Sequence, residues 1–425
     1  MLLKASQDGG LESTERLSLL YLTNKLLVLE ENQLESINKA QVDLVLGALF
    51  RTYSEAWDSF GVILAGVGQT ILHEPEEAKE MADARRSLVN FLSEISARPE
   101  FAERYVMSMQ PLKIVRKLEE IMISPLASVS QVACLMLGNL ARDDDICIKM
   151  VRDLKIHEAA SMVLRDTVDV GTLHAVLGLL RNLAVPKDNK DSLAIVGVIE
   201  SLGKCWSMDV NPEIQSAAAS LIRQLVNGSI ANIKRLLSMS IALKDDTGSI
   251  QTQLTILMNL YKSSDQLPIR MEIARTTVAI IRTLHGKEID EKTRKMLLQD
   301  FYAQHTDLEI PLIDMITQTQ HPVVRSEGWF ALGLMSKDGP GRGLISQHVS
   351  EPELMNLLRD TILETTPSTP QPESEGTAIR SLQSGPLNGT KDTKDRENAM
   401  VVVYELTKFE VSSSTILCKN LYTTD

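Results

Sequence analysis

The sequence predicts an all-α protein in which short helices stack as repeats, an α-solenoid. One observation is internal repetition: VACLMLGNLARDDDICIK begins at Val132, and AVLGLLRNLAVPKDNK begins at Ala175. Aligning Asn139 with Asn182 gives an offset of 43 residues, and a fixed period near 40 is typical of helical-repeat arrays. The other observation is composition, because 44% of the 425 residues are hydrophobic while only 4% are aromatic. Aliphatic residues of this kind fill the seams between stacked helices.

Both copies end in Leu-x-Asn-Leu-Ala, the pattern of the third helix of an armadillo repeat. Leu137 matches Leu180, and Leu140 matches Leu183. We expect these leucines in the core and the asparagines in a concave groove. The predicted fold class is therefore an armadillo-repeat right-handed superhelix.

Apolar periodicity predicts the helices in order. Before the repeat that begins at Val132, they lie at 11–31, 41–56, 82–95 and 112–123. The stretch 57–72 is also apolar, but its glycines either weaken the helix prediction or permit close packing. The repeat that begins at Val132 follows. Further helices lie at 146–154, 159–164, 173–183, 193–205, 214–226, 250–261, 269–284, 297–301, 308–317, 324–335 and 398–409. Helices 250–261 and 269–284 lie too close for two full repeats. Either one repeat is compressed, or one of the two predictions is wrong.

Composition divides the chain into four parts. Residues 1–80 form divergent N-terminal helices, and 81–364 form the armadillo repeats. Residues 365–397 are rich in Pro, Gly, Ser and Thr, which predicts a disordered insertion. Residues 398–425 supply the last repeat helix and a tail.

The formal net charge is −12. An acidic chain is a poor match for nucleic acid and suits a basic protein partner, although charge also serves solubility. The sequence has no signal peptide and no run of about 18 apolar residues, so we expect no membrane span. The four cysteines form no C-x-x-C pair, so zinc and disulfides are not expected. These features predict a cytoplasmic protein.

No catalytic constellation is evident, so we predict a protein that is not an enzyme and uses no cofactor or metal. The seven histidines are scattered. Asp143, Asp144 and Asp145 suggest a loop or helix cap at the rim of the array, compatible with contact to a basic partner. The run 339–343, GPGRG, lacks the ending of a phosphate loop, so we interpret it as a flexible turn.

Polar residues recur on otherwise apolar third helices and are the candidate partner-binding groups. They are Asn139, Asn182, Asn259 and Gln224, with Arg142 and Arg181 beside them. Their amides could grip a partner's backbone or bridge neighbouring helices. The two arginines could pair with acids or remain solvated.

Two extended motifs resemble the armadillo-repeat GDP-dissociation stimulators of small GTPases (SmgGDS-like, the Rap1 GTPase-GDP dissociation stimulator family). The first motif is G-N-x-A-R-x-D-x-x-C, and the second is L-R-N-L-A-x-P-x-x-N-K. The matching residues are Gly138, Asn139, Ala141, Arg142, Asp144 and Cys147, then Leu180, Arg181, Asn182, Leu183, Ala184, Pro186, Asn189 and Lys190. The run 396–406, RENAMVVVYEL, is similar to late repeats of that family.

The resemblance implies binding of small GTPases of the Rho and Ras type, with a polybasic and often prenylated tail, and promotion of GDP release. Such a protein accelerates dissociation without covalent chemistry. The alternative is an armadillo adaptor or cargo-binding scaffold without exchange activity. Importin-α-like carriers place Trp four residues before the groove Asn, where this chain has Leu135 and Gly178.

Overall fold

The structure, a computed structural model, describes residues 45–46, 49, 75–99, 101, 112–207, 211–244, 250–318, 320–348, 351–363 and 388–409. Nearly all of these residues are helical, which confirms the predicted all-α class. The helices expected at 11–31 and 41–56 and the apolar stretch 57–72 lie outside the described residues, apart from three positions. The chain divides into two compact units, Met1–Cys205 (unit 1) and Trp206–Asp425 (unit 2). The division falls within the stretch 81–364, which was predicted to form one array of repeats.

Unit 1 repeats a three-helix pattern. Its helices are α4 (Pro75–Ser96), α6 (Leu112–Met122), α7 (Ala127–Leu140), α8 (Asp144–Arg152), α9 (Ile156–Asp166), α10 (Val170–Leu183), α11 (Lys187–Ile195) and α12 (Val198–Trp206), the last of which ends at the boundary of unit 2.

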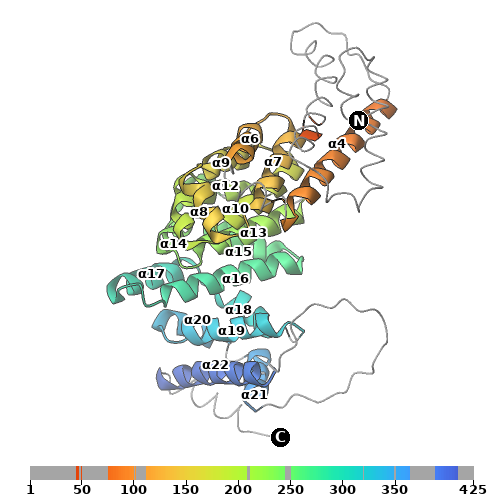
Figure 1. Ribbon diagram of the computed structural model, residues 1–425. Helices are drawn as coiled ribbons and strands as arrows, with labels where there is room; N and C mark the ends of the chain where they lie inside the picture. The colour runs from red at the N-terminus through yellow and green to blue at the C-terminus, as the bar shows by residue number, and fades with distance from the viewer. Residues whose placement is uncertain are drawn as a thin grey trace, which may run out of the picture. The chain divides into compact units, whose positions relative to one another are not determined.

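The third helices α4, α7 and α10 pack side by side, as the sequence repeat predicts. Figure 1 shows α7 and α10 with α9 and α8 beside them. The four aligned leucines, at 137, 140, 180 and 183, are all at most 1% exposed, which confirms their place in the core. Burying a leucine side chain stabilises the fold by about 2 kcal/mol relative to leaving it exposed. The four leucines therefore stabilise the packing of α7 against α10.

Polar caps at the helix starts explain where the elements of unit 1 begin. Asp143 caps α8 by accepting hydrogen bonds from the backbone N–H groups of Asp145 and Ile146. Asp169 caps α10 by accepting from the N–H of Thr172. Pro186 follows α10 and stands as the N-cap of α11. The predicted interpretation of Asp143 as a helix cap is thus confirmed.

Unit 2 contains ten helices in the part of the chain that the structure describes. They are α13 (Pro212–Val226), α14 (Ile230–Leu237), α15 (Gln253–Ser263), α16 (Leu267–Leu284), α17 (Glu291–Gln304), α18 (Glu309–Ile316), α19 (Pro322–Met335), α20 (Gly339–His348), α21 (Pro352–Leu363) and α22 (Asn388–Phe409). Helix α13 packs against α16, α16 against α19, and α19 against α22, so these four form the row of third helices.

The crowded region between α14 and α16 differs from the sequence prediction. A short antiparallel hairpin of β1 (Met239–Lys244) and β2 (Ile250–Thr252) precedes α15, where a helix was expected from residue 250. Thr252 ends the strand and caps α15, because its hydroxyl accepts a hydrogen bond from the N–H of Thr255 at 3.0 Å. Helix α15 packs on α14 and α16, whereas α16 packs on α13. Of the two close helices, α16 is therefore the third helix.

Two segments predicted to be irregular are helical. The run 339–343 forms the first half of α20, with Gly341 buried. Helix α22 begins at Asn388, so the last ten residues of the predicted insertion belong to the final helix. The rest of that insertion lies outside the described residues, as does the tail 410–425. In the described chain no helix is long and apolar enough to cross a bilayer.

Candidate partner-binding site

Asn139 and Asn182 each join a third helix of unit 1 to the one before it. Nδ2 of Asn139 donates to the carbonyl oxygen of Ser93 and to Oγ of Ser96, both at 3.0 Å. Nδ2 of Asn182 donates to the carbonyl oxygen of Gly138 at 2.9 Å. The same link thus recurs in successive repeats. Both amides bridge neighbouring helices, and both side chains are partly exposed.

The two flanking arginines differ in their contacts. The guanidinium of Arg142 donates to the carbonyl oxygen of Ala97 at 2.9 Å and to Oδ1 of Asn139 at 3.3 Å, so it extends the bridge. Arg181 is exposed and has no side-chain partner among the residues that the structure describes. Arg142 is therefore held in place by the preceding repeat, while Arg181 is available to a ligand.

The three aspartates after α7 form an exposed acidic rim, which we call the Asp143–Asp145 rim. Asp143 uses Oδ1 to cap α8, with the N–H groups of Asp145 and Ile146 at 2.9 and 3.3 Å. Asp144 and Asp145 occupy the first helical turn, where negative charge interacts favourably with the helix dipole. Their carboxylates remain exposed, so the rim offers two negative charges beside Arg142.

Gln224 and Asn259 are the two candidate residues that lie in unit 2. Gln224 is half-buried near the end of α13. Asn259 is exposed on α15, which is not in the row of third helices, so the asparagine pattern does not continue there. Thr283 of α16 makes the inter-helix link instead, because its Oγ1 accepts from the N–H of Gly228 at 2.8 Å. Periodicity alone could not separate α15 from α16.

A second set of polar residues, which the sequence pattern did not indicate, has a structural role. Nδ2 of Asn189 donates to the carbonyl oxygen of Leu183 at 2.9 Å, and Nδ2 of Asn232 donates to that of Leu225 at 3.0 Å. Both asparagines are buried and tie the next helix back to the end of a third helix. They stand 43 residues apart, so the repeat period was the signal that could have identified them. Asn189 in the P-x-x-N-K motif thus has a structural role.

The buried cysteines show no sign of reactivity. Burial raises the pKa of the Cys134 thiol to about 12 and that of Cys205 to about 11. Burial also raises the pKa of Cys147 to about 11, with the nearby carboxylates of Asp144 and Asp143 contributing. These thiols are therefore protonated at neutral pH and pack as small apolar groups. Within the described ranges, no three His, Cys, Asp or Glu side chains gather as metal ligands.

Replacing Asn139 and Asn182 together by alanine is expected to lower the free energy of unfolding by about 2 kcal/mol, about 1 kcal/mol for each lost link. The carbonyl oxygens of Ser93 and Gly138 would lose their amide donors. Urea denaturation followed by circular dichroism measures this change. Asn259→Ala is the control, because Asn259 is exposed and outside the row, and it should have little effect. Equal stability of the double variant and the control would contradict the bridging role.

The repeated triplets, the third-helix row and the amide bridges define the class: this is an armadillo-repeat protein. Among solved structures, an engineered protein of the Northeast Structural Genomics Consortium superposes with a TM-score of 0.58 at 16% identity. That match covers 100% of this chain and 94% of the engineered chain, and it shows the fold alone. No protein-family model matches the sequence.

Two curated relatives are named for a more particular kind of protein. Over 204 residues, the chain is 26% identical to Rap1 GTPase-GDP dissociation stimulator 1-B of Xenopus laevis, covering 48% of this chain and 30% of the relative. Over 301 residues, it is 23% identical to GTPase-GDP dissociation stimulator vimar of Drosophila melanogaster, covering 67% and 47%. The chain is thus similar to GDP dissociation stimulators, of the kind that its motifs resemble. It spans less than half the length of these relatives.

Proposed function

We propose that this protein regulates a small GTPase by binding it and promoting the release of GDP. The observation that carries the proposal is the similarity over 204 residues to a relative named as a Rap1 GTPase-GDP dissociation stimulator. The armadillo fold is compatible with it, because rows of helices present extended surfaces to a protein partner. Since the chain spans less than half of each relative, the activity must be tested on this chain itself.

Promotion of GDP release requires differential binding and no catalytic acid or nucleophile. A protein that binds the nucleotide-free GTPase more tightly than the GDP-bound form must, by linkage, weaken GDP binding to the same extent. If the preference is tenfold, the coupling free energy is about 1.4 kcal/mol. Such an effect needs a surface that contacts the GTPase in one state more than in the other.

We place the contact surface at the C-terminal ends of α7 and α10, with the Asp143–Asp145 rim. Arg181 is exposed there, and Asn139, Arg142 and Asn182 stand beside it. The rim carboxylates fit Lys and Arg side chains, so the partner would be a Rho- or Ras-type GTPase with a polybasic tail, which is prenylated in some members. In unit 2, Gln224 and exposed Asn259 are further candidate contacts.

The direct test is GDP release from a panel of purified Rap, Ras and Rho proteins loaded with a fluorescent GDP analogue. The expected result is faster loss of fluorescence with this protein than with buffer, for at least one GTPase, and complex formation with the stripped form. Binding without faster release would overturn the exchange activity and indicate the adaptor alternative. The absence of binding to the whole panel would overturn the proposal.

Replacing Asp144 and Asp145 by asparagine is expected to slow association with a polybasic GTPase roughly threefold at low salt. The reason is loss of steering charge, and 1 M salt should reduce the difference because the screening length falls to about 3 Å. Stopped-flow association rates across a salt series provide the measurement. The matched control is Glu158→Gln with Glu200→Gln, two exposed acids in first turns of other unit 1 helices. If both pairs slow association equally, only the net charge matters.

A further inference from the structure

A pocket of about 400 Å³ lies between two inter-helix turns of unit 1, at the N-terminal ends of α7 and α10. One turn joins α6 to α7, and the other joins α9 to α10. Asn139 and Asn182 lie near the opposite ends of the same two helices, so the pocket is separate from the proposed GTPase contact surface. Its volume falls in the range of about 300–1,000 Å³ that small-ligand sites occupy.

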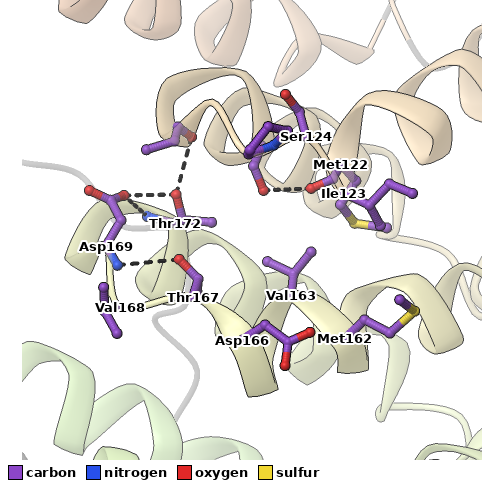
Figure 2. A pocket seen from close by; sticks show the side chains of 13 residues that line it. Met122, Ile123, Ser124, Met162, Val163, Asp166, Thr167, Val168, Asp169 and Thr172 are labelled. Carbon is purple, nitrogen blue, oxygen red and sulfur yellow. Dashed lines mark hydrogen bonds between the residues drawn. The ribbon is translucent and has the colours of Figure 1, made fainter. Parts of the chain in front are cut away.

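Apolar side chains dominate the exposed part of the pocket. Figure 2 shows Met122, Ile123 and Met162 on one side, with Val168 on the other. Ile123 is 55% exposed, Met162 46% and Val168 87%, while Met122 is fully buried. These three exposed apolar side chains border the hollow, so a ligand bound there would remove apolar surface from water.

The hydroxyl groups in the walls are used within the protein. Oγ of Ser130 donates to the carbonyl oxygen of Met122 at 2.5 Å. Oγ1 of Thr172 lies 3.1 Å from the carbonyl oxygen of Ala127 and 2.7 Å from Oδ2 of Asp169 (Figure 2). The contact between Thr172 and Ala127 links the two turns, because Ala127 begins α7 and Thr172 lies in the first turn of α10. The pocket is therefore a preformed feature of the helix starts.

The charged residues that line the pocket are both carboxylates. Asp166 pairs with its neighbour Arg165 at 2.8 Å. Asp169 uses Oδ2 to cap α10, and its Oδ1 has no partner among the residues described. The ammonium group of Lys204 donates from Nζ to the carbonyl oxygens of Arg165 and Thr167 at 2.8 and 3.0 Å, so it is already hydrogen-bonded within the protein. Oδ1 of Asp169 is thus available to a cationic donor.

We propose that this pocket docks an extended segment of a protein partner in which a bulky aliphatic side chain stands next to Arg or Lys. The aliphatic group would cover Met162 and Val168, and the cation would bind Asp169. Charge complementarity selects this occupant. A fatty acid would bring its carboxylate toward Asp169, and a second copy of this chain carries a net charge of −12. The site is a second docking point, and the test of it does not depend on whether the protein promotes GDP release.

Methionine methyl NMR on the full chain tests the proposal, because Met122 and Met162 both line the pocket. The Met162→Leu variant assigns one signal. The probes are N-acetyl-Leu-Arg-amide, N-acetyl-Leu-Glu-amide and octanoate. We expect saturable shifts of the Met162 methyl with the Leu-Arg probe, at about threefold lower concentration than with the Leu-Glu probe. Equal binding of the two dipeptides, tighter binding of octanoate, or no saturable shift would each overturn the proposal.

Two variants with matched controls locate the binding. Asp169→Asn keeps a good N-cap residue and removes the charge, so it should abolish the preference for Leu-Arg without loss of the fold. Val168→Ser should weaken both dipeptides, whereas Ile195→Ser, at a side chain 71% exposed on another helix of unit 1, should change neither. A preference for Leu-Arg that survives in the Asp169→Asn variant would place the cation elsewhere and overturn the assignment.

Discussion

Replacing Gly341 by alanine is expected to lower the free energy of unfolding of the protein by about 3 kcal/mol. A Cβ atom at this position would lie 2.5 Å from the carbonyl oxygen of Met335 and 2.9 Å from Cζ of Tyr302. Helix α20 cannot easily move away, because Nε of Arg342 donates to the carbonyl oxygen of Ser336 at 3.1 Å. The added methyl group must therefore displace backbone in a closely packed seam between α19 and α20.

The matched control is Gly343→Ala, two residues further along the same helix. No atom lies within 4 Å of its Cβ position, and the residue is exposed. Since alanine favours helix over glycine by about 1 kcal/mol, this variant should be more stable than the parent chain. Urea denaturation followed by circular dichroism compares the two variants. Stabilisation by both substitutions would contradict the close approach of α20 to α19.

The run of glycines around Gly341 shows why local sequence patterns mislead here. Glycine and proline at 339–343 predict a flexible turn, because both residues disfavour helix interiors. In the structure Pro340 stands in the first turn of α20, where a missing N–H costs nothing. Gly341 is required because another helix comes close. That requirement depends on α19 and Tyr302, which no window of sequence around Gly341 contains.

Features set by local sequence were predicted correctly. The register of the leucines at 137, 140, 180 and 183 follows from the 3.6-residue helical period and the 43-residue offset. The cap at Asp143 follows from an aspartate placed just before an apolar period. By contrast, α15 and α16 have equally good helical patterns. Which of them joins the row depends on packing against α13.

The candidate site could be predicted only in part, for the same reason. The sequence identified Asn139 and Asn182 as unusual and left two roles open, and the structure shows their bonds to neighbouring helices. Contact of these residues with a partner stays a prediction. No sequence motif indicated the pocket at the starts of α7 and α10, because common residue types from four helices form it. Only the fold brings Met122, Met162 and Asp169 together.

Asp395 provides the other large expected effect, and it lies in the stretch predicted as an insertion. The residue is in α22 and only 2% exposed. Nε of Arg325, on α19, donates to its Oδ2 at 3.0 Å, and this ion pair joins the last two third helices. The arginine side chain is 22% exposed and can be hydrated in part, whereas the aspartate cannot. The two partners should therefore differ in what their removal costs.

Arg325→Met is expected to lower the free energy of unfolding by about 3 kcal/mol, because it leaves the buried Asp395 carboxylate without its partner. Adding Asp395→Leu should restore much of the loss, since an apolar pair replaces the ion pair without an unpaired charge. The control is Arg359→Met, which removes an exposed pair with Asp360 and should cost less than about 1 kcal/mol. Urea denaturation of Arg325→Met, of Asp395→Leu and of the double variant measures the coupling free energy between Arg325 and Asp395 directly. If Arg325→Met costs no more than Arg359→Met, the pair does not hold α22 against α19. If the double variant is as unstable as Arg325→Met, the loss of unfolding free energy comes from the packing of the arginine side chain and not from the unpaired carboxylate of Asp395.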